Sequence, residues 1–587
     1  MNAAHGLWDG TAAHELLLPT PVRTEVLGGH PIDASALGRQ PVVRKDAALP
    51  GGGYRLRVDG DGIAVVCADG AGARSARATI AQLRNASRGA PLLAVSIEDH
   101  PAIAQRGVML DVSRDRVPRM DELLEQIGVL ASLKANHLQL YTEHTFAYAR
   151  HEAVWRGSGA ITPGEARRLD AACTEAGIEL VPNQNCFGHL TRWLSHPGYA
   201  HLAETHGDWT FLGMARSGPF SLCPTDAASL RFVEGLLDEL LPCFASGLVN
   251  VGCDETHDIG HGRSRGAVAQ RGRGAVYADF AGAVCAAAIE RGRRPMFWAD
   301  IAGEEPELLD RLPGEAVGMV WGYEPGASFE REARELRARG RRWWACCGTS
   351  SWRSLVGRTS ERRANVREAA RGAIEHEGDG MLITDWGDLG HRQVWPVALL
   401  AIADGLDAAW TGGARSARFL DACDAQLFGG ARGTAAWLEA LGDADEPVRA
   451  IAGGRTDDEA PKRLANAGAL FTELHPPPEV PGRPRRLPMD ADAWRRVREV
   501  AEGLAASVPG PAGSLVRDEC AHAAACALWA ADVAIVRRGD RARAGDLVSR
   551  RDGIEREHAR LWRVRSRAGG LADSLGWWRR VELGGAP

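Results

Sequence analysis

From Arg106 to about residue 410 the sequence alternates between short apolar segments and longer amphipathic ones, and this alternation constrains the fold more than any other feature. Strands that alternate with helices form parallel sheets, and eight such units predict an α/β fold of the (β/α)8 TIM-barrel type. The expected strands are 108–113, 137–143, 178–184, 248–254, 295–300, 316–322, 341–348 and 380–387. Helical patterns between them include 120–134, 275–291, 329–339 and 394–408. A doubly wound sheet would have fewer units, and no glycine-rich phosphate loop follows the first strand.

The segments on either side of this alternation have different patterns. Strand-like runs at 54–58 and 62–67 precede a helical run at 71–83, and beyond about residue 415 the pattern is almost continuously helical. A chain of 587 residues is long enough for two to four domains. We therefore predict a small α/β N-terminal domain at 1–100, a catalytic barrel at 101–415 and a helical C-terminal domain at 416–587. The clearest helices of the last domain are 493–508, 515–537 and 552–567.

Composition limits the classes of partner. The formal net charge of −6 provides no basic field, so we expect no nucleic-acid partner. No basic segment followed by an apolar run opens the chain, and we find no segment of membrane-spanning length, so we expect no membrane partner and a cytoplasmic location. The 12 cysteines lack zinc-finger or CxxC spacing, which favours buried free thiols. The sequence leaves open whether the chain forms a homodimer.

The fourth expected strand ends on two adjacent carboxylates, Asp254 and Glu255. Neighbouring residues inside a strand point to opposite faces, so both can face one cavity only if the strand ends there. Two crowded acids repel each other when both are ionised, which separates their pKa values and their roles. Such a pair suits glycoside hydrolysis, in which one carboxyl group protonates the leaving oxygen. If this Asp-Glu pair stood alone, a solvated loop would be the better interpretation. The residues at the neighbouring strand ends therefore decide between a solvated loop and a catalytic pair.

The other strand ends are also polar or aromatic, and catalytic groups of such barrels collect at the C-terminal ends of the strands. They carry Arg114 after strand one, Glu143 after strand two, His189 after strand three, Trp298 after strand five, Trp321 and Tyr323 after strand six, and Trp386 and Asp388 after strand eight. Flat aromatic side chains pack on the apolar faces of sugar rings, while carboxylates and guanidinium groups bind hydroxyls. The set therefore predicts a sugar-binding site.

Metal chemistry is the main competing interpretation, because five histidines lie near strand ends: His144, His151, His189, His257 and His261. A metal-dependent hydrolase of this type needs His or carboxylate ligands converging on one ion. The first strand provides Asp111 and Arg114 instead, and an arginine repels a metal cation. We predict no metal and no cofactor.

Three motifs, in this order, resemble the family 20 glycoside hydrolases, the β-N-acetylhexosaminidases. They are Arg106-Gly-Val-Met-Leu-Asp-Val-Ser-Arg114, Asn250-Val-Gly-Cys-Asp-Glu-Thr256 and Trp386-Gly-Asp388. The resemblance covers roughly residues 50–410. It implies an exo-acting, retaining enzyme that removes terminal β-linked GlcNAc or GalNAc from small glycans. Catalysis would be substrate-assisted: the 2-acetamido oxygen attacks C1 and forms an oxazolinium ion.

The resemblance also implies roles for the residues at the strand ends. Glu255 would be the general acid and then the base, and Asp254 would orient the acetamido N–H. Arg114 would bind hydroxyls of the terminal sugar, with Asp388 opposite and with Glu143 and His189 in the same substrate-binding set. Trp298, Trp321 and Trp386 would form the walls around the acetamido methyl group and the ring.

Two positions depart from the family pattern. Many members have an aspartate before the Gly-His pair after strand three, where this chain has Asn185. Many also hold the acetamido oxygen with a tyrosine near strand seven, whose end here, 345–352, has none. Tyr323 after strand six is the nearest candidate for that role.

Two other hypotheses stay open beside a β-N-acetylhexosaminidase. One is a catalytically silent sugar-binding protein, although binding alone does not require a proton donor such as Glu255. The other is a glycosidase with a nucleophile of its own, which needs a second carboxylate about 5 Å from Glu255. Asp300 and Asp385 are the candidates for that nucleophile.

Overall fold

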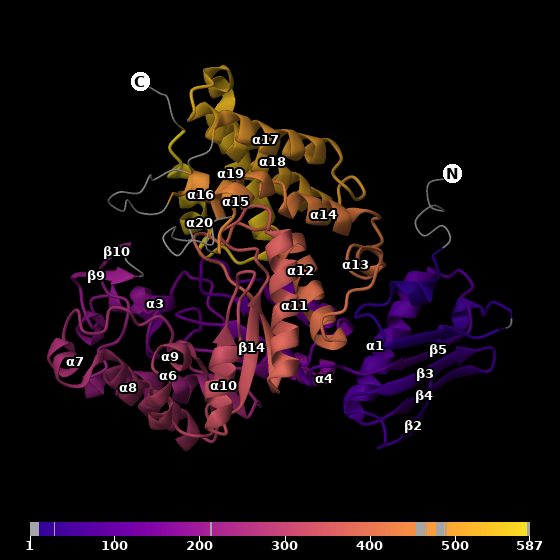
Figure 1. Ribbon diagram of the computed structural model, residues 1–587, viewed down its shortest axis with the longest axis horizontal. Helices are drawn as coiled ribbons and strands as arrows, with labels where there is room; N and C mark the ends of the chain where they lie inside the picture. The colour runs from indigo at the N-terminus through magenta and orange to yellow at the C-terminus, as the bar shows by residue number, and fades with distance from the viewer. Residues whose placement is uncertain are drawn as a thin grey trace.

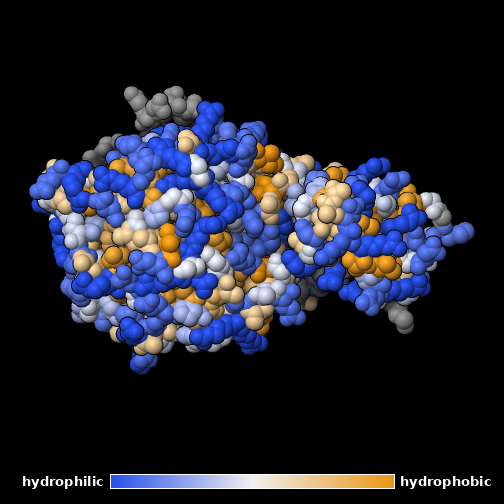
Figure 2. Space-filling model, turned by 90° about the horizontal axis from the view of Figure 1, so that it is seen from below, coloured by the Kyte–Doolittle hydropathy of each residue, from blue (hydrophilic) through white to orange (hydrophobic). Residues whose placement is uncertain are grey.

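The computed structural model of the chain describes residues 11–28, 30–211, 214–453, 464, 466–476, 487 and 490–583. An N-terminal sheet lies to one side of a central barrel, and a helical C-terminal region is stacked on the barrel (Figure 1). Seen from below, the N-terminal part is a small lobe joined to the larger body by a narrower waist (Figure 2).

Eight parallel strands form the central sheet, in the order β11-β12-β13-β14-β15-β6-β7-β8. They are β6 (Gln105–Asp111), β7 (His137–Tyr141), β8 (Glu179–Val181), β11 (Leu248–Asn250), β12 (Arg294–Trp298), β13 (Val317–Trp321), β14 (Trp343–Gly348) and β15 (Gly380–Asp385). A parallel bridge between Asn183 and Asn250 joins the first and last strands of this order, so the sheet closes into a barrel. The predicted fold class is confirmed, and each of the eight expected strands is present.

Burial on both faces explains why the strands form a parallel sheet. Every residue of β14 and β15 is buried, as expected for strands covered by helices outside and by packed side chains inside. The barrel interior is filled by large side chains, among them Met109, Met296, Met319, Trp344 and Leu382. The barrel is therefore a packed core, and its functional groups lie at one end of it.

Helices connect the strands around the barrel. They are α2 (Met120–Ser132), α3 (Glu152–Trp155), α4 (Pro163–Ala176), α6 (Ala227–Leu240), α7 (Arg265–Arg271), α8 (Arg273–Glu290), α10 (Glu330–Ala338), α11 (Thr359–Glu375) and α12 (Trp395–Thr411). The helices expected at 120–134, 275–291, 329–339 and 394–408 correspond to α2, α8, α10 and α12. The fifth crossover has only α9 (Asp300–Glu304) and a 3-10 turn (Pro306–Arg311), because Pro306 cannot continue the helix.

The long connection after β8 contains α5 (Thr191–Leu194) and a hairpin of β9 (Asp208–Phe211) and β10 (Met214–Ser217). His189 has a left-handed backbone, with φ of 57°. The insertion therefore carries a site residue to the barrel end.

The N-terminal sheet has the order β1-β5-β3-β4-β2 and is covered on one face by α1 (Gly70–Ser87). Its strands are β1 (Arg23–Val26), β2 (Val42–Lys45), β3 (Tyr54–Asp59), β4 (Gly62–Cys67) and β5 (Val95–Asp99). The expected segments 54–58, 62–67 and 71–83 are β3, β4 and α1. Strands β1 and β2 at the two edges were not expected, because they are mostly exposed and carry no alternation of buried and polar residues.

A buried ion pair joins the N-terminal sheet to the barrel. The Lys134 ammonium group, just after α2, lies 2.7 Å from the Asp99 carboxylate at the end of β5. The Tyr54 hydroxyl and the Trp410 indole N–H also donate hydrogen bonds to Asp99, at 2.7 and 2.8 Å. The Asp99 side chain is fully buried and that of Lys134 is 1% exposed, so both charges depend on this contact.

The C-terminal region is helical, as predicted. Its helices are α13 (Phe419–Gln426), α14 (Thr434–Gly442), α15 (Glu446–Gly453), α16 (Ala469–Leu474), α17 (Ala491–Ala506), α18 (Leu515–Val536), α19 (Leu547–Arg565) and α20 (Leu571–Arg579). By length and hydropathy α18 could cross a membrane, so the expectation that no segment reaches that length is wrong. Of the apolar window of α18, 83% is buried among the other elements, which is typical of a core helix.

The C-terminal region docks on the loops that follow β6 and β15. The Val117 carbonyl accepts from the backbone N–H of Arg567, and the Arg565 guanidinium group binds both Glu122 on α2 and Glu519 on α18. The Ser574 hydroxyl donates to the carbonyl of Gly390. The helices therefore contact the same end of the barrel as the expected site.

Candidate functional site

Asp254 and Glu255 lie on a sharp turn just past β11. The strand ends at Asn250, earlier than the expected Asp254, because Gly252 and Cys253 have φ values of 70° and 74° and leave the sheet ladder. Glu255 is also left-handed, with φ of 52°. This turn places both carboxyl groups within reach of one imidazole: His189 Nε2 is 3.3 Å from Asp254 Oδ2 and 3.5 Å from Glu255 Oε2.

The surroundings give the two acids opposite pKa shifts. Burial favours the neutral form of Asp254, but the charge of His189 and hydrogen bonds, one of 2.9 Å from Asn185, hold its pKa below the usual value. Burial raises the pKa of Glu255 to about 7; His189 opposes this shift, and the charges of Asp254 and Asp300 add to it. Near pH 6 the site therefore holds an ionised Asp254 beside a protonated Glu255.

His189 connects the acid pair to Arg114. Burial disfavours the charged imidazole, but the charge of Asp254 and its hydrogen bond raise the pKa of His189 to about 9. The other ring nitrogen, Nδ1, lies 3.2 Å from Arg114 Nη2. His189 therefore presents Nε2 to the carboxylate that stays ionised, while Nδ1 faces Arg114.

Arg114 lies at the centre of a ring of carboxylates. Its nitrogen atoms are 3.1 Å from Asp111, 3.4 Å from Glu143 and 3.5 Å from Asp388. The guanidinium group also lies over the rings of Tyr141 and Trp386, each 4.8 Å away. The Arg114 side chain is 18% exposed and that of Asp388 is 34% exposed, so the edge of this cluster is open to a ligand.

Aromatic side chains from three strand ends lie beside the acids. The Trp298 and Trp386 rings are 5.9 Å apart and tilted, and Trp321 is stacked on Tyr323 at 5.4 Å. The Trp386 indole N–H donates to the Tyr323 hydroxyl at 3.0 Å. With Tyr141 these rings form one cluster at the end of the barrel core. The arrangement can hold a flat, partly apolar ligand beside Asp254 and Glu255.

The structure thus brings the ten expected site residues into one contact network, although their individual roles stay predictions. It also shows contacts that the sequence analysis missed. Asp111 accepts hydrogen bonds from the backbone N–H groups of Ser113, Arg114 and Gly387, so it ties the first and eighth strand ends together. Asp111 was expected at the end of the first strand, but these contacts were not predicted.

The two candidate nucleophiles have other hydrogen-bond partners. Asp300 accepts from the backbone N–H of Glu255 at 3.1 Å and from the Trp321 indole N–H at 2.7 Å. Asp385 is 4% exposed, and one of its oxygen atoms accepts from the hydroxyls of Thr349 and Ser351. Both carboxylates therefore accept hydrogen bonds from groups of the protein itself.

His189, Asp254 and Glu255 could also hold a metal ion, since their ligand atoms lie within 4.8 Å of one another. The adjacent Arg114 guanidinium group disfavours a cation at this position. The other histidines near strand ends lie outside this cluster of ligand atoms. His144, for example, is buried, and its pKa is lowered to about 4 by that burial.

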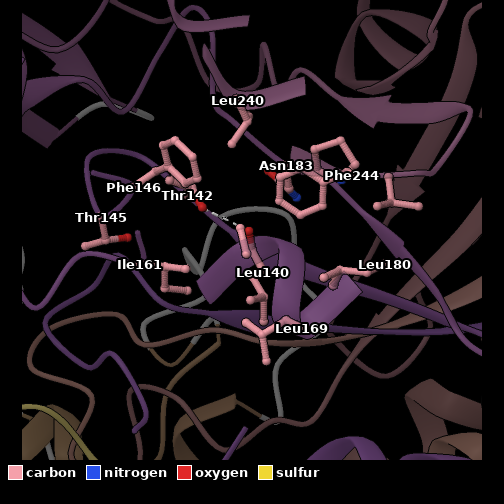
Figure 3. A pocket seen from close by; sticks show the side chains of 13 residues that line it. Leu140, Thr142, Thr145, Phe146, Ile161, Leu169, Leu180, Asn183, Leu240 and Phe244 are labelled. Atoms are coloured by element: carbon pink, nitrogen blue, oxygen red, sulfur yellow. Dashed lines mark hydrogen bonds between the residues drawn. The ribbon is translucent and has the colours of Figure 1, made fainter. Parts of the chain in front are cut away.

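The cavity in Figure 3 is separate from this site. It is small, with a cavity volume of about 20 Å³, and lies between β7, β8 and the helices outside them; its lining is mostly apolar, including Leu140, Phe146, Leu180 and Phe244. None of the ten expected site residues lines it, and no titratable side chain does. It is a gap in the packing between the barrel and its helical layer.

The comparisons with known families match the two N-terminal parts of the fold. The family described as "Glycosyl hydrolase family 20, domain 2" matches residues 15–100, and "Glycosyl hydrolase family 20, catalytic domain" matches residues 104–343. The chain belongs to glycosyl hydrolase family 20. The family 20 match ends at the start of β14, so Trp386, Asp388 and the C-terminal helices lie beyond it.

Relatives of this family 20 chain are distant. Hexosaminidase D of Bos taurus is 27% identical over 230 residues, which are 37% of this chain and 62% of the relative. A β-hexosaminidase of Akkermansia muciniphila is 27% identical over 270 residues, 42% of this chain and 53% of the relative. The chain spans less than two thirds of the length of these relatives.

Solved structures support the fold. The β-N-acetylhexosaminidase of Streptomyces coelicolor has a TM-score of 0.55 at 18% identity, covering 71% of this chain and 96% of that one. The exo β-N-acetylglucosaminidase of Vibrio harveyi, in complex with N-acetylglucosamine, has a TM-score of 0.56 at 16% identity, covering 74% and 78%.

Proposed function

We propose that this family 20 chain is a retaining, exo-acting β-N-acetylhexosaminidase that removes terminal β-linked GlcNAc or GalNAc from small glycans. The observation that carries the proposal is the pair of carboxyl groups on one imidazole, with the pKa of Asp254 lowered and that of Glu255 raised to about 7. A protein that only bound sugar would not need a carboxyl group that holds its proton at neutral pH.

In the first step Glu255 donates its proton to the glycosidic oxygen, and the bond from that oxygen to C1 breaks. The carbonyl oxygen of the substrate's own 2-acetamido group forms the new bond to C1. The resulting oxazolinium ion carries positive charge near the acetamido nitrogen, where ionised Asp254 accepts the N–H. The carboxylate is already ionised and bound by His189 and Asn185, so it needs little reorganisation as this charge develops.

In the second step water attacks C1 from the side that the leaving group has vacated. Glu255, now ionised, takes a proton from that water, and the ring of the oxazolinium ion opens to restore the acetamido group. Two displacements at C1 give retention of configuration. Glu255 ends the cycle protonated, as it began.

Tyr323 is our candidate for holding the acetamido oxygen. Its hydroxyl accepts the Trp386 indole N–H, so its own proton is available for the carbonyl oxygen. Tyr323 is packed between Trp321 and Trp352, with ring centroids 5.4 and 5.2 Å away. A tyrosine after strand six would therefore hold the acetamido oxygen, a role that a tyrosine near strand seven has in many family members.

The Arg114 cluster binds the hydroxyls of the terminal sugar. Arg114 donates to them, while Glu143 and Asp388 accept. Three carboxylates hold the guanidinium group in place, which fixes its planar fork before substrate arrives.

The cellular setting is also a proposal. All 12 cysteines are free and buried, which suits a reducing compartment, and we infer a cytoplasmic location on that basis. The choice between GlcNAc and GalNAc is tested by a panel of 4-nitrophenyl glycosides and short glycans.

The test of the mechanism compares substrates with and without the acetamido group. We expect 4-nitrophenyl β-GlcNAc to be hydrolysed orders of magnitude faster than the β-glucoside, because the acetamido group is a reactant. A thiazoline mimic of the intermediate should bind much more tightly than substrate. Asp254→Asn should weaken that binding and lower kcat together. Equal rates on the two glycosides, or a covalent glycosyl-enzyme trapped with a 2-fluoro sugar, would contradict the mechanism.

A further inference from the structure

One carboxylate connects the general acid to a wall of the sugar site. Asp300 Oδ2 accepts from the backbone N–H of Glu255, and Oδ1 accepts from the indole N–H of Trp321. The three residues come from three neighbouring strand ends, those of β11, β12 and β13. Asp300 forms no ion pair with a described cation. Its oxygen atoms therefore serve these two N–H groups.

The turn that carries Glu255 needs such a contact. Cys253 and Glu255 both have left-handed backbone, and each such non-glycine residue costs about 1–2 kcal/mol relative to ordinary conformations. Other contacts hold the residues before Glu255: the Tyr277 hydroxyl donates to the Cys253 carbonyl at 2.8 Å, and the Trp298 backbone N–H donates to Gly252 at 3.0 Å. At Glu255 itself, the backbone N–H is held by Asp300, and the backbone carbonyl accepts from the His257 N–H at 2.7 Å.

We propose that Asp300 is a positioning residue, which fixes the general acid Glu255 and the pocket wall Trp321 relative to each other through its two oxygen atoms. The inference rests on the proposed function, because the orientation of Glu255 matters for a proton transfer to the leaving oxygen. An acid displaced by a fraction of an ångström loses catalytic efficiency even when substrate still binds.

The charge of Asp300 acts on Glu255 as well. Burial raises the pKa of Asp300 itself to about 6, with a further contribution from Asp254, so Asp300 is largely ionised at neutral pH. Its negative charge is one of the causes that raise the pKa of Glu255. Asp300 therefore favours a proton on Glu255 and also directs where that proton points.

The first test replaces Asp300 by asparagine and measures the pKa of Glu255 by carbon NMR of glutamate-labelled protein, with Glu255→Gln to assign the signal. The amide keeps the volume but has a single acceptor oxygen and no charge. We expect the pKa of Glu255 to fall by about one unit, the effect of removing a charge at this range. This measurement needs no turnover, so it tests Asp300 even if the wild-type chain does not cleave N-acetylhexosaminides.

The second test is kinetic. In Asp300→Asn, kcat/KM should fall at least tenfold more on a short N-acetylhexosamine glycan than on an aryl glycoside with an acidic phenol, because the latter needs less proton donation. The basic limb of the pH profile should move to lower pH with the Glu255 pKa. Asp300→Glu separates the effect of charge from that of geometry. Because the charge is kept, the basic limb of the pH profile should not move. Because the carboxylate is displaced, kcat should still fall.

Two further variants serve as controls. Trp321→Phe removes the indole N–H that binds Asp300, together with part of the ring, and its effect on kcat should be non-additive with Asp300→Asn, because both changes break the same hydrogen bond. Asp258→Asn alters a buried aspartate on the same loop that accepts the Ser221 backbone N–H and does not contact Glu255. Asp258→Asn should lower thermal stability and leave the pKa of Glu255 unchanged.

Two outcomes for Asp300→Asn would overturn the proposal. One is a loss of stability with an unchanged Glu255 pKa. The other is a loss of stability with the same ratio of kcat/KM between the glycan and the aryl glycoside as in the wild type.

Discussion

Asp254 and Glu255 are neighbours in the chain, yet their surroundings move their pKa values in opposite directions. The difference comes from partners: Asp254 receives the hydrogen bond of Asn185 and lies nearer to the charge of His189, while Glu255 has mainly burial and other carboxylates around it. A small difference in position therefore decides which of the two carboxyl groups keeps its proton near neutral pH.

The pH dependence follows from these shifts. Glu255 acts as the acid only when protonated, and its pKa is raised to about 7, so kcat/KM should be high below pH 7 and fall about tenfold per unit above it. The acid limb should lie near the lowered pKa of Asp254. A pH profile of kcat/KM on a short N-acetylhexosamine glycan, whose leaving group needs the proton of the acid, measures both limbs. A basic limb at pH 5, or one that persists in Glu255→Gln, would contradict the assignment.

Arg114→Lys tests the sugar-binding role of the guanidinium group. A lysine cannot make the three carboxylate contacts and the hydroxyl contacts at once, so we expect kcat/KM to fall roughly 10- to 100-fold, mainly through KM. Thermal unfolding of the same variant is the control. If the melting temperature falls while KM does not move, Arg114 only supports the loop.

Much of the site was predictable because strand ends of a barrel meet at one edge, so the polar and aromatic residues at seven of the strand ends had to be neighbours. Arg114, His189 and Trp386 were identified in this way. Asp300 was identified as a polar strand end but interpreted as a candidate nucleophile, because the sequence does not tell which way a carboxylate points. The partners of Asp111 are backbone N–H groups of two strand ends, and no spacing rule predicts which backbone groups a buried carboxylate will contact.

The elements differ in how well the pattern of the sequence reveals them. Strands buried on both faces, such as β14 and β15, are continuous apolar runs and were expected within two residues of their bounds. Edge strands β1 and β2 are exposed and carry no such signal. β11 is shorter than expected because Gly252 and Cys253 turn away from the sheet. Prediction therefore fails where backbone conformation, and not burial, defines an element.

The contact between β5 and the loop after α2 gives a prediction at the level of elements. Lys134→Met leaves the buried carboxylate of Asp99 without its cation, so we expect a loss of about 3 kcal/mol in the free energy of unfolding. Urea unfolding followed by tryptophan fluorescence measures it. Arg55→Met, which breaks an exposed pair with Glu98 on the same sheet, should change stability by less than about 1 kcal/mol. Equal losses in the two variants would contradict the role of burial.

In the whole molecule, the C-terminal helices are joined to the site by the loops on which they dock. Arg565 bridges Glu122 of the barrel and Glu519 of the helical region, and Ser574 binds Gly390, two residues beyond Asp388. The loop of Asp388, which we propose binds sugar hydroxyls, is therefore supported by a region that lies beyond the family match.

Arg565→Met tests this support. It leaves two largely buried carboxylates without their partner, and we expect a loss of about 3 kcal/mol in the free energy of unfolding. If docking supports the Asp388 loop, KM should rise in the same variant. Arg560→Met, on the exposed side of the same helix, is the matched control and should change neither quantity measurably. An unchanged KM in a destabilised Arg565→Met protein would show that the helices support the fold only.

The pairing of β15 with β6 joins residues that are far apart in the chain, with Asp385 opposite Leu110. On a ribosome that adds about 5–20 residues per second, β6 waits some tens of seconds for its partner. Cysteines that the barrel will bury, such as Cys173, Cys186 and Cys253, emerge during that interval. Their protection from oxidation is a property of the finished barrel, so the nascent chain depends on its compartment or on a chaperone to keep these thiols reduced until β15 closes the ring.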